Sequence, residues 1–123
     1  MVQMYIKGES LIIKLKDFEK VGALKGSLEI PFNCIGKVAY FKDLDDTEKK
    51  QIHPKLRVGG TYIGEILYGR FTTGLGLAFF ATKKLERSIV MYISCSFPYK
   101  IVVIEVSDSE TLSELENKLK SRF

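Results

Sequence analysis

The sequence SIVMYISCSFPYKIVVIEVSDSETLSELENKLKSRF, residues 88–123, decides the fold. Residues 89–93 and 101–106 are short apolar runs rich in β-branched side chains, which is typical of buried strands. Residues 96–99 lie between the two runs, and Pro98 cannot donate a hydrogen bond to a strand ladder. We therefore predict two strands joined by a turn.

The end of this stretch predicts a helix. Ser107 and Glu110 have the spacing of a capping box, so Ser107 or Asp108 is expected to cap the first turn. Apolar residues then recur at helical spacing: Leu112, Leu115, Leu119 and Phe123. We expect this apolar face to be buried against the strands.

Length and composition indicate a single globular domain, residues 1–123. The chain is 46% hydrophobic and 28% charged, a balance that excludes a disordered protein. Its net charge of +4 permits an anionic partner without requiring one.

Further short strands are predicted along the chain. Residues 5–7 and 11–15 flank Gly8-Glu9-Ser10 as a hairpin. Other strands are expected at residues 27–32, ending near an edge or a bulge at Pro31, and at residues 34–41, 64–67 and 77–83. Such strands need closure or a second sheet to protect their edges. The fold is predicted to be mainly β: a small antiparallel barrel, or a strongly bent sandwich, of seven or eight strands capped by the C-terminal helix.

Two segments between the strands have helical character. Residues 17–23 are long enough only for a single turn. Residues 42–54 are strongly polar, with acids before bases, and predict either a short surface helix or a solvated loop. Their acids lack the glycine and the closing glutamate of a calcium loop, so no metal is expected there.

The cysteines and the histidine give no metal signature. Cys34 and Cys95 are far apart, no CxxC motif is present, and His53 has no partner at ligand spacing. We expect two buried, reduced thiols, with a disulfide or a reactive thiol as the alternative. Residues 1–5 do not resemble a signal peptide, so a cytoplasmic protein is expected.

No catalytic constellation is evident. His53 stands alone in a polar segment, without a nucleophile beside it. Asp45 and Asp46 lack the apolar surroundings that would raise a carboxyl pKa. The sequence Gly74-Leu75-Gly76 precedes a strand and lacks the lysine of a phosphate loop. We expect no enzyme activity and no cofactor.

The chain resembles the bacterial and archaeal pleckstrin-homology-like (PH-like) proteins, specifically small stand-alone members without an assigned function. The resemblance lies in residues 11–15, 18–26, 28–32 with Ile35, 56–64 and 106–108, and residues 19–26 (EKVGALKG) are its most specific part. It implies a PH-like barrel with a C-terminal capping helix and no enzyme activity. It assigns no functional residue.

The resemblance favours a non-enzymatic binding or scaffold module. Its partner would be a protein or peptide, bound through a rim loop or an open strand edge, and self-association is a further possibility. Specific phosphoinositide binding is not expected, because the first hairpin turn carries one cation, Lys7, and one anion, Glu9. The alternative is a small β-barrel that binds nucleic acid or an anionic surface, since aromatic and basic residues interleave: Tyr62, Tyr68, Phe71, Phe79 and Phe80 with Arg57, Arg70, Lys83 and Lys84.

The candidate binding residues lie in one stretch, Arg57, Gly59, Gly60, Thr61, Tyr62 and Gly64. Glycines allow a ligand to approach the backbone closely, and Arg57 offers a fork of donors for a carboxylate or phosphate. Tyr62 adds a flat face with a polar tip. We expect this stretch to be a rim loop whose glycines let a long connection turn into the next strand. The functional hypothesis beside this is that the loop, with Arg57 as its charged anchor, contacts a partner or a small anion.

Overall fold

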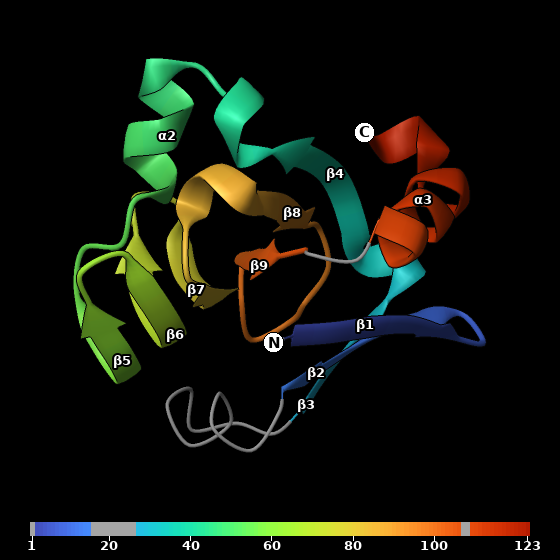
Figure 1. Ribbon diagram of the computed structural model, residues 1–123, viewed down its shortest axis with the longest axis horizontal. Helices are drawn as coiled ribbons and strands as arrows, with labels where there is room; N and C mark the ends of the chain where they lie inside the picture. The colour runs from blue at the N-terminus through green and yellow to red at the C-terminus, as the bar shows by residue number, and fades with distance from the viewer. Residues whose placement is uncertain (1, 16–26, 107–108) are drawn as a thin grey trace.

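The computed structural model describes residues 2–15, 27–106 and 109–123 (Figure 1). These residues contain nine strands: β1 (Val2–Lys7), β2 (Ser10–Leu15), β3 (Ser27–Pro31), β4 (Ile35–Tyr40), β5 (Arg57–Ile63), β6 (Ile66–Thr73), β7 (Gly76–Thr82), β8 (Ser88–Ile93) and β9 (Ile101–Glu105). Two α-helices accompany them, α2 (Asp46–Ile52) and α3 (Ser109–Lys118). Short 3-10 turns lie beside strands, η1 (Phe32–Cys34), η2 (Phe41–Asp43) and η3 (Leu85–Arg87), and a further one, η4 (Lys120–Arg122), follows α3. The mainly β prediction is confirmed.

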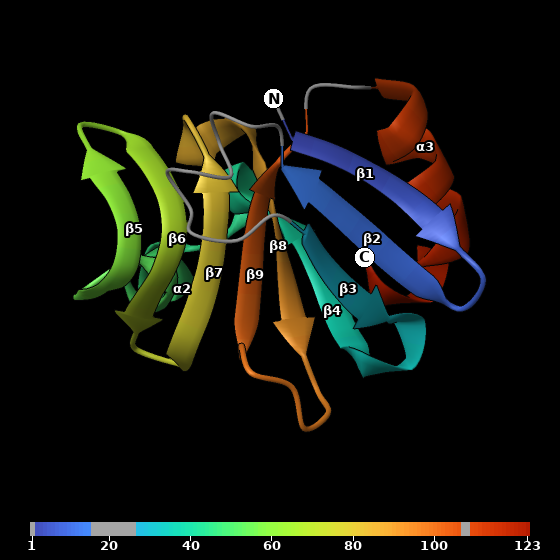
Figure 2. The same cartoon turned by 90° about the horizontal axis from the view of Figure 1, so that it is seen from below.

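The strands form two open sheets and not the expected closed barrel. One sheet has the order β1-β2-β3, and the other has the order β4-β8-β9-β7-β6-β5 (Figure 2). The first sheet lies across only one end of the larger sheet, near β4, and leaves β5 and β6 at the other end (Figure 2). Among the described residues, no strand pairing joins the two sheets into a ring.

One pairing is parallel, which the all-antiparallel prediction missed. β8 and β9 form the expected hairpin, but β9 also inserts beside β7 and runs parallel to it, with Phe80 opposite Val103. β9 is an inner strand of a sheet that has a core packed on each face, and such strands read as continuous apolar runs. Val102 and Val103, which point to opposite faces, are both fully buried.

The larger sheet carries a core on each face. On one face, Phe79 and Val102 pack with residues of the three-stranded sheet and with Leu115 of α3. On the other face, Phe71 and Val103 pack with Ile52 of α2 and with other buried residues. In Figure 1, α2 and α3 accordingly lie on different sides of the molecule.

The prediction of two reduced thiols is wrong, because Cys34 and Cys95 form a disulfide with their Cα atoms 4.9 Å apart. Strand pairing is the physical reason. Cys34 precedes β4 and Cys95 follows β8, and these strands are antiparallel with Ile35 opposite Ile93. The ends of the two strands therefore bring the cysteines together. The Ser94 amide also donates to the Cys34 carbonyl at 2.7 Å.

The predicted burial of the C-terminal helix is confirmed for two of its leucines and in part for a third, whereas Phe123 is exposed. Leu115 and Leu119 are buried, and Leu112 is half-buried against the same core. The expected cap at Ser107 or Asp108 lies outside the described residues. Leu119 is followed by η4, and Phe123 contacts the Tyr40 ring with centroids 6.1 Å apart.

The polar segment forms a helix, the first of the two predicted alternatives. The Glu48 amide donates to Asp45 Oδ1 at 2.8 Å, so Asp45 caps α2. Acids begin the helix and lysines follow, in the order that the helix dipole favours. Ile52 anchors its end in the core. The single turn expected at residues 17–23 lies outside the described residues.

The hydroxyl of Tyr40 on β4 donates to Glu116 Oε1 on α3, and this contact predicts a dependence of stability on pH. Burial, the hydrogen bond and the Glu116 charge raise the pKa of Tyr40 from 10.0 to about 12. Because the raised pKa belongs to the folded state, the stabilisation is fully present below pH 10.0 and is lost as the pH rises through about 12. We expect the difference between the ultraviolet titrations of the wild type and Tyr40→Phe to have its midpoint near pH 12. Glu116→Gln should lower that midpoint, and a difference midpoint at the ordinary tyrosine value would contradict the assignment.

Candidate functional site

The stretch that was expected to be a rim loop is a strand at the edge of a sheet. Arg57 to Ile63 form β5, the outer strand of the six-stranded sheet, and Gly64 begins the turn into β6. The prediction of a loop is therefore wrong, because the glycines that suggested it have another use. Figure 2 shows β5 at the end of the sheet that is farthest from α3.

Gly60 allows the backbones of β5 and β6 to approach each other closely. It lies opposite Gly69, and both residues have positive φ, 123° and 137°. A Cβ atom on Gly60 would lie 2.1 Å from the Tyr68 carbonyl oxygen and 2.7 Å from the Gly69 Cα. The two backbones are thus too close for any side chain. Gly60 is required by the sheet itself and gives no evidence of a ligand.

The outward side of β5 carries backbone groups that no other strand of the described residues pairs with. The pair Ile63–Ile66 closes the two-residue turn Gly64-Glu65, and such a pair exchanges two hydrogen bonds. Antiparallel pairs alternate, so the N–H and C=O groups of Tyr62 and Gly60 point away from β6. The close approach of Gly60 to Gly69 fits this assignment, since non-hydrogen-bonded pairs are the closer ones. The outward Gly60 carbonyl accepts a bond from Arg57 Nη1 at 3.4 Å.

Exposed apolar side chains gather at this edge. Eight large apolar side chains are exposed among the described residues, and five of them lie in or beside β5: Leu56, Val58, Tyr62, Ile63 and Ile66. Leu56 is 70% exposed and Ile63 is 68% exposed. β5 contains neither lysine nor proline, the usual residues that protect an edge strand from pairing. Its protective features, the charged Arg57 and a bulge at Val58, lie at one end, and residues 60–63 beyond them pair in regular register.

The edge strands β4 and β1 lie against helical elements at the C-terminal end of the described chain. At the far end of the six-stranded sheet, η4 contacts β4, and the Tyr40 hydroxyl bonds to Glu116 of α3. In the smaller sheet, α3 contacts the outer strand β1. Figure 1 shows α3 beside these strands and remote from β5. β5, in contrast, is an edge strand with exposed apolar side chains in and beside it.

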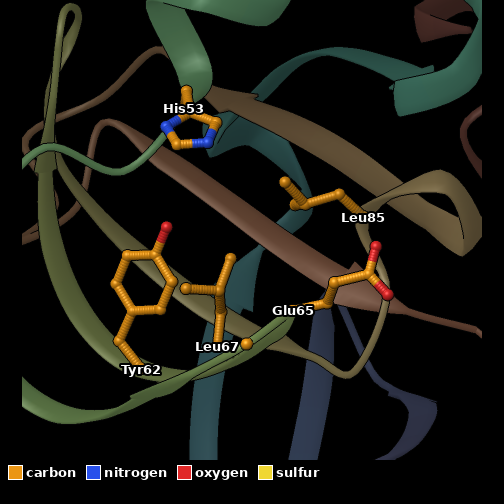
Figure 3. Close-up of a pocket in the computed structure, with 6 residues that line it drawn as sticks. His53, Tyr62, Glu65, Leu67 and Leu85 are labelled. Atoms are coloured by element: carbon orange, nitrogen blue, oxygen red, sulfur yellow. The ribbon is translucent and has the colours of Figure 1, made fainter.

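A small pocket lies beside the end of β5. Its volume is about 160 Å³, and it is lined by His53, Tyr62, Gly64, Glu65, Leu67 and Leu85. Figure 3 shows the Tyr62 hydroxyl directed toward His53, with Glu65 and Leu85 on the other side of the space. His53 caps the C-terminal end of α2, Glu65 belongs to the β5–β6 turn, and Leu85 comes from η3. Three separate segments therefore meet around this pocket.

The hydrogen bond of His53 determines whether its free ring nitrogen offers the pocket a donor or an acceptor. His53 Nδ1 lies 3.1 Å from the Pro54 carbonyl oxygen. A carbonyl oxygen can only accept, so Nδ1 carries the hydrogen and Nε2 of the neutral ring is an acceptor. The Glu65 carboxylate is also an acceptor. The pocket therefore presents acceptors above an apolar surface formed by Leu67 and Leu85.

The structure unites only part of the predicted site. Tyr62 and Gly64 line the pocket, whereas Arg57 lies at the opposite end of β5 and Gly59 and Thr61 pair with β6. His53, Glu65, Leu67 and Leu85 were not predicted to share a site. One signal for Glu65 was present, because Gly64-Glu65 repeats the Gly-Glu turn of the first hairpin, Gly8-Glu9.

The rings proposed for stacking on nucleic acid are mostly internal. Tyr68, Phe71, Phe79 and Phe80 are buried, and Tyr62 is the one exposed ring of the five. Phe71 packs edge-on against Phe80 and Tyr62, with centroids 5.5 and 5.8 Å apart. These four rings form core contacts and offer no platform to bases.

Comparisons of the chain with protein-family models, curated proteins and solved structures give no match. Within residues 2–15, 27–106 and 109–123, no three histidine, cysteine or acidic side chains are grouped to hold a metal ion. No helix in this part of the chain has the length and apolar character to cross a membrane.

Proposed function

We propose that this protein is a non-enzymatic binding module that adds an extended segment of a protein partner to the free edge of β5. The observation that carries the proposal is the combination, on one strand, of outward backbone groups and exposed apolar side chains. Addition of a strand to a sheet edge is a common mode of peptide recognition. A PH-like relationship remains part of this proposal, supported by the mainly β fold and its packed C-terminal helix.

Backbone hydrogen bonds between β5 and the added strand would determine the register of the complex. The outward N–H and C=O groups of Gly60 and Tyr62 can bond to every second residue of an added strand. Each such bond contributes about 0.5–1.5 kcal/mol net. The Arg57 side chain at present bonds to the Gly60 carbonyl, and it would release that acceptor when the partner pairs.

Side chains at the edge define the composition of the partner segment. Val58 and Ile63 are more than half exposed, so β-branched or other apolar residues of the added strand would bury them. Arg57 on β5 and Arg70 on β6 are exposed at the same end of the hairpin. They favour a carboxylate at the corresponding end of the partner segment.

The substitution Ile63→Lys should block this binding. A lysine on an edge strand opposes pairing with another strand, while the exposed position should keep stability within about 0.5 kcal/mol of the wild type. The probe is a blocked eight-residue peptide of alternating threonine and valine that ends in aspartate. We expect at least an approximately tenfold loss of affinity, measured by fluorescence anisotropy of the labelled peptide. The matched control is Leu75→Lys, which places the same charge on the exposed β6–β7 turn and should bind as the wild type does.

Hydrogen exchange checks the mode of binding. The peptide should slow exchange at the amides of Gly60 and Tyr62, which point outward, more than at Thr61, which faces β6. The affinity should change little from low to physiological salt, whereas a phosphate-driven complex would weaken steeply. Equal binding by Ile63→Lys and wild type, or no added protection on β5, would overturn the proposed function.

A further inference from the structure

The pocket beside β5 lies where a side chain of an added strand would reach. Tyr62 belongs both to the edge and to the pocket, and it lies opposite Leu67, which also lines the pocket. Side chains of an added strand that face the same way as Tyr62 point toward this space. Resting on the proposed function, we propose that the pocket is a subsite for one basic side chain, lysine or arginine, of the bound segment.

The polar groups of the pocket select a donor. His53 Nε2 is an acceptor in the neutral ring, because Nδ1 donates to the Pro54 carbonyl oxygen. Glu65 contributes a second acceptor, and a full negative charge. The Tyr62 ring adds a face that attracts cations. A carboxylate or phosphate ligand would be repelled by the Glu65 carboxylate and would find no donor at His53 Nε2, whereas an ammonium or guanidinium group can donate to either acceptor.

The size and the apolar lining fit a side chain with a long aliphatic stem. The pocket volume is about 160 Å³. Sites for drug-sized ligands are larger, roughly 300–1,000 Å³. Leu67 and Leu85 would contact the methylene groups of lysine or arginine while the charged end reaches Glu65. One side chain therefore uses both the apolar and the polar parts of the pocket.

The charges along the hairpin are consistent with this assignment. Glu65 is the only acidic residue from Arg57 to Thr73, and it lies at the turn. Arg57 and Arg70 lie at the other end of the same two strands. The edge thus has opposite charges at its two ends. A partner segment with an acid at one end and a base at the other would match both, and it could pair in only one direction.

A lysine scan of the peptide tests the subsite. The host is the alternating threonine–valine peptide. Lysine is placed at each position in turn, and a peptide with norleucine at the same position is the uncharged control. We expect lysine to bind about tenfold tighter than norleucine at one register position, because it adds charge-assisted hydrogen bonds. Glu65→Gln should abolish this preference and leave the affinity for the norleucine peptide unchanged. Glu9→Gln, the same change on the exposed turn of the first hairpin, should retain the preference.

The outcomes separate the pocket from the edge. Should lysine and norleucine peptides bind equally well at every position, the subsite is overturned and the β5 edge still stands. A preference that persists in Glu65→Gln also overturns the subsite. If none of the peptides binds, the proposed function and the subsite fail together.

Discussion

Reduction of the Cys34–Cys95 disulfide is expected to lower the free energy of unfolding by about 4 kcal/mol. The two cysteines are separated by 61 residues, so the bond closes a long loop and removes much of the freedom of the unfolded chain. It also joins the ends of β4 and β8, an edge strand and its neighbour in the six-stranded sheet.

Urea unfolding with and without a reductant measures this effect. The double variant Cys34→Ser, Cys95→Ser should resemble the reduced wild type, and the reductant should leave its stability unchanged. Titration of free thiols provides the complementary check, because the oxidised protein has no free cysteine. Equal stability of the oxidised and reduced wild type would contradict the prediction.

The substitution Leu115→Ala is expected to destabilise the protein by roughly 2–5 kcal/mol. Leu115 is 1% exposed and belongs to the core between the sheets and α3. Its truncation leaves a cavity there, in addition to the lost burial of the side chain. The measurement is the midpoint of chemical unfolding at constant slope.

Two neighbouring substitutions provide the comparison on the same helix. Leu112→Ala should cost less, because Leu112 is only half-buried. Glu114→Ala changes an exposed side chain and should stay within about 0.5 kcal/mol of the wild type. If Leu115→Ala and Glu114→Ala had the same stability, the packing of α3 described above would be wrong.

Local patterns predicted the local structure well. The apolar runs at residues 89–93 and 101–106, with Pro98 between them, gave the β8–β9 hairpin. The leucine spacing gave the buried face of α3. These features depend on residues close in sequence, and their periods are set by backbone geometry. The pairing of β9 with β7 depends on two distant segments, and no local pattern in either strand specifies its neighbour.

Some residues of the candidate site were predicted from the sequence, but the secondary structure that they adopt was not. Glycines in residues 57–64 suggested a loop, yet Gly60 is a glycine because Gly69 lies against it across the sheet. That contact is invisible in sequence, since it depends on the register of β5 and β6. The pocket likewise needs His53 from α2 and Leu85 from η3, which only the packed structure brings to Tyr62. The disulfide was missed for the same reason: β4 and β8 must pair before its cysteines meet.

The position of β9 has a consequence for synthesis of the chain. β5, β6 and β7 follow one another as antiparallel neighbours and can pair as soon as they leave the ribosome. The strand that joins β7 to β8 is synthesised after both of them, at residues 101–105. Until β9 is made, the growing chain holds two separate parts of one sheet, with the apolar edge of β7 bare. β9 therefore converts these parts into a continuous sheet, through a hairpin with β8 and a non-local pairing with β7.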